Sequence, residues 1–243
     1  KYAGLFLDRL DPIRDHDMAQ NGEGTGFEIT IEAARALAHW MAYEDVIRVA
    51  DLKTRPDRLP RIRKDLKAAP DQPVVVVDFL KPGLEEFCSV LPGFLARPLL
   101  GWAGRHNKLD SFNVGLHITT SGAFGYGLMR FMASLKSIRR AGHRYASEQA
   151  LIERWLTAVK GALSLDRETG IEVIACARLV KGYGETHRRG SSNLSRILTE
   201  LIEPAVESGV LIAAQQIKKA RTAALADSSC AELDSTMATL LSN

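Results

Sequence analysis

Apolar residues recur every three or four positions along most of this chain, which is the spacing of one face of an α-helix. The pattern is clear after Thr30, a residue in a helix-capping position, where Leu37, Ala38 and Met41 follow at helical spacing. Glycine, proline and acidic residues interrupt the pattern, and we expect the helices to end there. The helices predicted in this way cover about residues 30–53, 57–67, 84–90, 94–106, 122–136, 147–164, 168–181, 192–217 and 218–241.

Two segments follow the pattern of strands instead. Residues 74–80 form a β-branched run of strand length, and residues 112–119 alternate between apolar and polar side chains. Two strands are too few for a doubly wound nucleotide-binding sheet, which is made of several alternating units. We therefore expect a mainly α, α+β fold, in which a multi-helix domain carries one small β-sheet of about two strands.

The beginning of the chain keeps neither pattern for long. Residues 11–26 are rich in Asp, Gly, Asn and Gln and show no apolar period, so we expect a flexible loop there after a short opening helix. The residues from Lys1 onward look like the middle of a helix, which suggests a piece of a longer protein. We treat residues 1–243 as a single mainly helical module.

Composition and charge argue against two classes of function. The chain is 46% hydrophobic and 25% charged, as in ordinary globular proteins, and lacks the roughly 18 consecutive apolar residues of a membrane helix. The net charge of +3 is too small to indicate nucleic-acid binding by bulk electrostatics. Basic residues do cluster between Arg55 and Lys67, which is typical of a solvated helix face or an anchor for an acidic neighbour.

The cysteines and histidines point to no metal or cluster site. Cys88, Cys176 and Cys230 lie far apart, so they form neither a disulfide framework nor the closely spaced thiolates that usually hold an iron–sulfur cluster. The six histidines have no metal-binding spacing. We expect no metal site in this chain and a location in the reducing cytoplasm.

The most distinctive segment is residues 181–190, where glycines punctuate a predicted turn between two helices. It collects side chains suited to binding an anion, with arginine as a bidentate clamp and lysine as a point charge. Alternatively, the glycines only end one helix and start the next, and the charges pair with neighbours. The candidate residues, for an anion or a partner domain, are Lys181, Tyr183, Glu185, His187, Arg188 and Arg189.

A weaker candidate surface lies on the predicted helix 30–53. Glu44, Arg48 and Asp51 follow one another at spacings of four and three, which places them on one helix face. Ion pairs within the helix would explain the spacing, although each stabilises a helix by only about 0.2–0.5 kcal/mol. Docking to a partner domain is the other interpretation.

Residues 119–125, Thr-Thr-Ser-Gly-Ala-Phe-Gly, follow a strand and open a helix. A helix N-terminus is a favourable place for an anion. The segment matches no phosphate-loop motif, however, and its glycines equally suit close contacts between backbone segments. Both interpretations stay open.

A family pattern runs through residues 40–53, 78–83, 144–145, 152–156 and 181–190. The last of these segments, Lys-Gly-Tyr-Gly-Glu-Thr-His-Arg-Arg-Gly, is the most specific. Together they resemble the C-terminal module of the indolepyruvate ferredoxin oxidoreductase beta-subunit family, over most of the chain from residue 28 to about 200.

The resemblance implies a parent enzyme that oxidatively decarboxylates aryl-2-oxoacids such as indolepyruvate to an acyl-CoA. In that family, thiamine diphosphate and iron–sulfur clusters belong to other domains, so we expect no cofactor and no catalytic residue in this chain. The implied partners are the thiamine- and iron–sulfur-carrying alpha subunit or domain, a preceding gamma-type domain of the same chain, and ferredoxin through the complex.

Two roles for the module remain open. It is either a non-catalytic part that assembles the complex or closes the substrate cavity, or a binding module that holds an anionic substrate or CoA through residues 181–190. We expect the isolated chain to be inactive in both cases.

Overall fold

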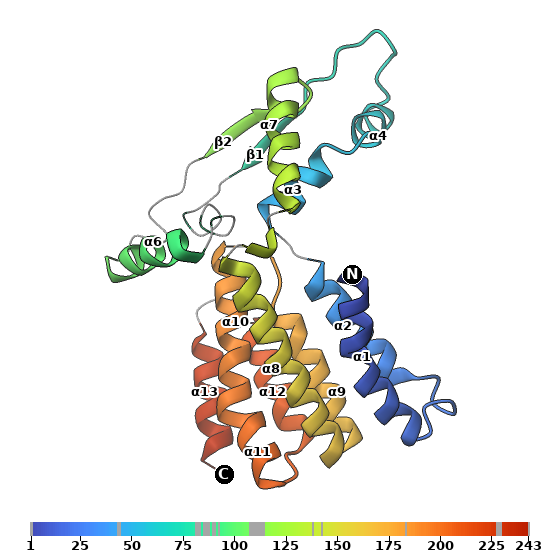
Figure 1. The fold of residues 1–243 in the computed structure, drawn as a ribbon, viewed down its shortest axis with the longest axis vertical. Helices are drawn as coiled ribbons and strands as arrows, with labels where there is room; N and C mark the ends of the chain where they lie inside the picture. Colours follow the sequence, from blue (N-terminus) through green and yellow to red (C-terminus); the bar gives the residue numbers. More distant parts are fainter. Residues whose placement is uncertain are drawn as a thin grey trace. The chain divides into compact units, whose positions relative to one another are not determined.

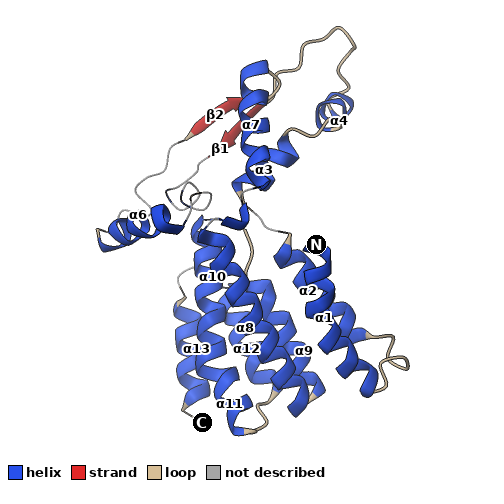
Figure 2. Ribbon diagram, viewed as in Figure 1, coloured by secondary structure: helices blue, strands red, loops and turns tan. Residues whose placement is uncertain are grey.

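The computed structural model describes residues 2–42, 45–80, 84, 88, 91, 93–106, 115–137, 139–141, 143–182, 184–226 and 230–242. Helices dominate these residues, and two strands form a small antiparallel sheet (Figures 1 and 2). The predicted mainly α, α+β fold class is confirmed. No described helix is long and apolar enough to cross a membrane.

The module expected from the sequence is built from two compact units. Unit 1 comprises residues 1–43, 149–181 and 186–243, and unit 2 comprises residues 44–148 and 182–185. Unit 1 is a helical bundle (Figure 1). Its elements are α1 (Tyr2–Ala19), α2 (Glu28–Met41), α8 (His143–Leu165, in unit 1 from Gln149), α9 (Arg167–Ala175), the 3₁₀ segment η3 (Cys176–Leu179), α10 (Gly184–Ile197, in unit 1 from Thr186), the π-helical turn η4 (Leu198–Ile202), α11 (Glu203–Ser208), α12 (Ala214–Ala226) and α13 (Ala231–Leu241).

The core of unit 1 is large and apolar, and Trp155 of α8 lies fully buried within it. The indole N–H of Trp155 donates to the Val173 carbonyl of α9 at 2.9 Å, so the ring carries no unpaired donor into the core. Its ring centroid lies 5.7 Å from that of Trp40 in α2. One side chain thereby joins three helices that are far apart in the sequence.

Helix α1 is longer than the sequence suggested. It continues to Ala19 and buries Ile13 and Asp17. The Asp17 carboxylate accepts hydrogen bonds from the Thr30 N–H at 2.9 Å and the Thr30 hydroxyl at 2.7 Å, which satisfies a backbone donor in the first turn of α2. The loop predicted for residues 11–26 is therefore wrong over residues 11–19, and the non-helical connection covers residues 20–27.

The helix predicted for residues 192–217 is also divided. Pro204 has no backbone N–H and cannot continue an α-helical ladder, and the preceding residues 198–202 adopt π-helical hydrogen bonding. Helix α11 then ends at Gly209, whose φ of 67° is left-handed, as is common at a helix C-terminus. Within this arrangement, Arg154 of α8 forms a bidentate pair with Glu203, at 2.6 and 2.7 Å.

Unit 2 combines the sheet with short helices. Strand β1 (Val77–Leu80) pairs antiparallel with β2 (Leu116–Thr119), so that Val77 faces Thr119 and Leu80 faces Leu116. The remaining elements are α3 (Val46–Lys53), α4 (Arg58–Asp65), α6 (Gly93–Arg105), α7 (Ala123–Ser134) and the 3₁₀ turns η1 (Leu135–Ser137) and η2 (Arg139–Ala141). A small apolar cluster joins α3, β2 and α7 through Ala50, Ile118, Met129 and Ala133.

The single helix predicted for residues 30–53 is two helices, one in each unit. The Asp45 side chain accepts a hydrogen bond from the Arg48 N–H at 2.8 Å and caps the start of α3. Aspartate is a preferred N-cap, so the local sequence competes with continuation of the helix. The apolar period alone did not reveal this break, because it runs on through Val46 and Val49.

Gly125 lets α7 lie directly against the end of β2. A Cβ atom at Gly125 would stand 2.1 Å from the backbone oxygen of Thr119, far inside van der Waals contact. Two residues later, Gly127 lies on the exposed side of the same helix, where a Cβ atom would meet nothing within 4 Å. The two glycines of one helix therefore have different structural roles.

Gly125→Ala is expected to lower the free energy of unfolding of unit 2 by about 2 kcal/mol or more, because a backbone segment must move to admit the methyl group. Gly127→Ala is the matched control and should raise stability by up to about 1 kcal/mol through helix propensity. Urea unfolding followed by circular dichroism measures both. Equal stability of the two variants would contradict the close contact.

Candidate functional site

Residues 181–190 lie mostly on a helix and do not form the loop expected from the sequence. Helix α10 begins at Gly184, so Glu185 and the three residues His187, Arg188 and Arg189 occupy its first two turns. Lys181 precedes the helix and is exposed, Glu185 is exposed, and the other three are half-buried. Tyr183 lies outside the described residues. A common binding site for these side chains stays a prediction.

The glycines of this segment have a backbone explanation. Gly182 and Gly184 have φ angles of 71° and 58°, in the left-handed region that glycine adopts without strain. At Gly190 a Cβ atom would stand 2.0 Å from the Leu179 carbonyl oxygen, so α10 can pass that carbonyl only where no side chain intervenes. Gly182 and Gly184 therefore lie between η3 and the body of α10, as one interpretation of the sequence expected, whereas Gly190 lies inside α10.

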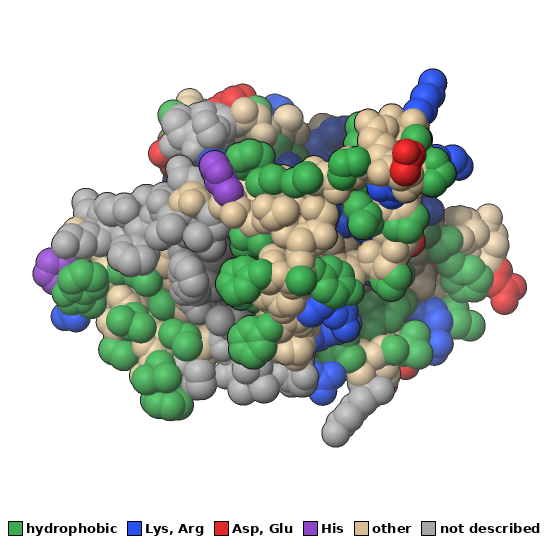
Figure 3. Space-filling view, turned by 90° about the horizontal axis from the view of Figure 1, so that it is seen from above, with side chains coloured by type: hydrophobic (Ala, Val, Ile, Leu, Met, Phe, Trp, Pro, Cys, Tyr) green, Lys and Arg blue, Asp and Glu red, His purple; other side chains and the backbone are tan. Residues whose placement is uncertain are grey.

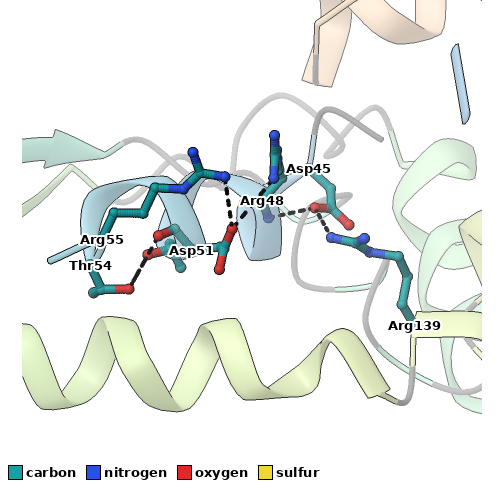
Figure 4. A network of polar contacts seen from close by, with 7 residues as sticks. Asp45, Arg48, Asp51, Thr54, Arg55 and Arg139 are labelled. Atoms are coloured by element: carbon teal, nitrogen blue, oxygen red, sulfur yellow. Dashed lines mark hydrogen bonds and ion pairs between the residues drawn. The ribbon is translucent and has the colours of Figure 1, made fainter. Parts of the chain in front are cut away.

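The weaker candidate residues belong to a polar network in unit 2 (Figure 4). Arg48 pairs with Asp51 at 3.4 Å, and Arg55 approaches the same carboxylate at 3.7 Å. Asp45 accepts a hydrogen bond from Arg139 at 2.7 Å while it caps α3. Glu44 lies outside the described residues. The intrahelical ion pair predicted for Arg48 and Asp51 is present, and docking to a partner stays a prediction.

A second polar cluster, which was not predicted from the sequence, is centred on Asp78 of β1. This carboxylate is buried, and it accepts hydrogen bonds from Lys53 at 2.6 Å and Arg58 at 3.0 Å. The Thr120 hydroxyl donates to its other oxygen at 2.6 Å and accepts from Arg58 at 3.0 Å. The cluster thus connects α3, α4, β1 and the residue after β2.

The protonation of Asp78 reflects two opposing effects. Burial by itself raises the pKa of this carboxyl, but the hydrogen bonds from Lys53 and Thr120 and the charges of Lys53 and Arg58 outweigh it. The net result is a pKa below the ordinary value of 3.8. Asp78 is therefore an anion at neutral pH.

A cavity of about 390 Å³ opens beside this cluster, within unit 2. Its cationic wall consists of Lys53, Arg55 and Arg58, and its lining also includes Ser121 and Gly122 at the start of α7. Asp78 does not line the cavity itself; it is buried and orients the lining side chains of Lys53 and Arg58 through hydrogen bonds. Such an arrangement presents fixed positive charge to a small ligand.

The sequence shows the two segments that line this cavity, but it does not show that they lie side by side in the fold. The basic cluster that begins at Arg55 and the predicted helix start after Thr119 lie 64 positions apart in the sequence. They meet because β1 and β2 pair with Val77 opposite Thr119. An aspartate within the run Val74–Leu80 is the one signal that marks the buried charge, since carboxylates are rarely buried without partners.

Asp78→Asn should lower the free energy of unfolding of unit 2 by about 2 kcal/mol at pH 7, because charge-assisted hydrogen bonds are lost. A depressed carboxyl pKa contributes stability above the unfolded-state pKa of about 3.9 and loses it as the pH falls through the folded-state value. The difference between wild type and variant should therefore persist down to about pH 4 and shrink below it. Thermal unfolding from pH 7 to pH 2 measures this.

The exposed Asp57, which pairs with Arg61 at 3.9 Å, provides the control. Asp57→Asn should change stability by less than about 0.5 kcal/mol at every pH. If Asp78→Asn behaved in the same way, the buried carboxylate would not organise the cluster.

Comparison with known proteins assigns the chain to a family. A family model described as a family of unknown function, DUF6537, matches residues 1–200. Neither the curated proteins nor the solved structures contain a significant match. Since the family model covers most of the 243 residues, the chain belongs to the DUF6537 family.

Proposed function

We propose that the chain is a non-catalytic assembly module of a 2-oxoacid:ferredoxin oxidoreductase of the indolepyruvate type. In this proposal, unit 2 docks onto the subunit or domain that carries thiamine diphosphate and the iron–sulfur clusters. The chain itself supplies no cofactor and acts in the cytoplasm, as the scattered cysteines suggest. The supporting observation is the set of exposed aromatic side chains on unit 2.

All the strongly exposed aromatic side chains among the described residues belong to unit 2. Figure 3 shows apolar side chains on the surface of the molecule, interspersed with lysine and arginine. Aromatic residues are enriched in protein–protein interfaces, because they bury a large area at a low cost in conformational entropy. The exposed aromatic residues are Phe79, Phe94, Trp102, Phe124, Tyr126 and Phe131.

Helix α7 has an apolar side chain pattern on two faces. One face buries Gly125, Met129 and Ala133 within unit 2. Phe124, Leu128 and Phe131 follow at helical spacing on exposed positions, with Phe124 86% and Phe131 64% exposed. A helix with one buried face normally places polar residues on the other, yet Arg130 is the only charged residue of α7. The exposed face suits a second protein surface.

The choice of partner rests on the sequence resemblance. Residues 40–53, 78–83 and 181–190 resemble the module that accompanies the catalytic domains in indolepyruvate ferredoxin oxidoreductases. An apolar helix face that covers such a domain would assemble the complex or close its substrate cavity. The proposal therefore names the thiamine- and iron–sulfur-carrying part as the occupant, and ferredoxin as a partner only through the complex.

Replacing Phe124 and Phe131 together by Ser should weaken assembly with the purified catalytic subunit or domain by at least about tenfold, as expected when two aromatic anchors are lost. The melting temperature of the isolated chain should change little, because both side chains are exposed. Co-purification of the co-expressed parts and indolepyruvate-dependent ferredoxin reduction measure the effect.

Leu7→Ser is the matched control, since Leu7 is 57% exposed on a helix of unit 1. It should leave assembly and activity unchanged. The proposal fails if the catalytic part binds the double variant as tightly as wild type, or if it assembles and turns over indolepyruvate normally without this chain.

A further inference from the structure

We infer that the cavity between α4 and the start of α7 is a binding site for a small organic phosphate. The inference does not depend on the docking proposed above, because it rests on the cationic wall; of the exposed aromatic residues only Tyr126 lines the cavity. Its volume of about 390 Å³ falls within the range of small-molecule pockets, which is roughly 300–1,000 Å³.

The wall carries more positive charge than the buried carboxylate can neutralise. Lys53 and Arg58 both bind the single carboxylate of Asp78, so this group of three side chains has a net positive charge. Arg55 adds a further cation at the cavity, and its pair with Asp51 is long, at 3.7 Å. The surplus charge faces the cavity and attracts an anion.

The wall is also held in place before a ligand arrives. Lys53 is 2.6 Å from Asp78, and Arg58 is additionally fixed by bonds to the Lys53 carbonyl at 3.1 Å and the Thr120 hydroxyl at 3.0 Å. Side chains that are already ordered lose little conformational entropy on binding. Asp78 therefore acts as a positioning residue for two cations of the site.

The start of α7 adds hydrogen-bond donors to the cavity. Ser121 accepts a hydrogen bond from the Val76 N–H at 3.0 Å, which leaves its hydroxyl proton available to a ligand. Helix α7 starts there with Gly122 as its N-cap, and among the described residues no side-chain hydrogen bond caps it. The first backbone N–H groups of a helix and its dipole favour an anion. Several donors and cations around one space suit a dianion with three oxygens.

The rest of the lining is apolar and selects an ester over a free ion. This part of the lining consists of Pro56, Leu59, Pro60 and Ile62, from α4 and the residues before it, together with Val76, Ala123 and Tyr126. An apolar substituent on the phosphate would displace water from these side chains, which stabilises binding. Phenyl phosphate combines the two chemistries and serves as the probe.

The test is calorimetric titration of the 243-residue chain with phenyl phosphate, inorganic phosphate, benzoate and phenol. We expect saturable 1:1 binding of phenyl phosphate, at least about tenfold tighter than that of phenol, because charge-assisted hydrogen bonds are worth that factor or more. Inorganic phosphate and benzoate should bind more weakly than phenyl phosphate. Raising the salt concentration should weaken binding, since the cations are partly exposed.

Two variants locate the site, and a third controls for general charge. Lys53→Met should weaken phenyl phosphate binding by about tenfold. Arg55→Ala should weaken it by about threefold, because the Arg55 side chain is half-exposed. Arg61→Ala removes an equally positive residue from α4 that does not line the cavity, and it should leave the affinity unchanged. Circular dichroism melts of each variant show that the comparison is made on folded protein.

The inference is overturned if phenyl phosphate does not bind, if Arg61→Ala weakens binding as much as Arg55→Ala, or if folded Lys53→Met and Arg55→Ala bind like wild type. Benzoate binding as tight as phenyl phosphate would indicate a carboxylate site instead and would also overturn it. These measurements use the chain alone, so their outcome is separate from that of the assembly experiment.

Discussion

The buried carboxylate of Asp78 is the constraint on which unit 2 depends. A charge removed from water is tolerated only with partners at short distance, and its partners here come from α3, α4 and the residue after β2. The same bonds that satisfy Asp78 fix the cationic wall of the neighbouring cavity. Stability and a preformed binding surface thus have a common physical origin.

The two units differ in how much apolar surface they bury. Unit 1 buries a large apolar cluster around Trp155, whose indole N–H is paired with the Val173 carbonyl. Among the described residues of unit 2 the apolar cluster is small, and the exposed aromatic residues of this unit leave much apolar surface in water. Contact with another protein would remove this exposed apolar surface from water.

The sequence predicts the fold class because helical spacing and a β-branched run are local signals. Local capping signals can outweigh that spacing, as Asp45 does between α2 and α3 and as Pro204 and Gly209 do around α11. The pairing of the two strands was predicted, but the Asp78 cluster also depends on their register and on where α3 and α4 lie, which no local pattern specifies. The glycines of residues 181–190 predict a turn, but α10 already begins at Gly184, so most of this segment is helical.

The π-helical turn at residues 198–202 makes the contacts of α11 depend on chain length. A π turn holds about one residue more than an α turn, and one residue rotates the following side chains by about 100°. With that extra residue, Glu203 pairs with Arg154, and the Val206 side chain packs directly against Gly161 of α8. A Cβ atom at Gly161 would stand 2.3 Å from a methyl carbon of Val206. Loss of a single residue from the turn would present a different side of α11 to α8. Relatives that keep these two contacts must therefore keep the length of this turn, whatever residues they place in it.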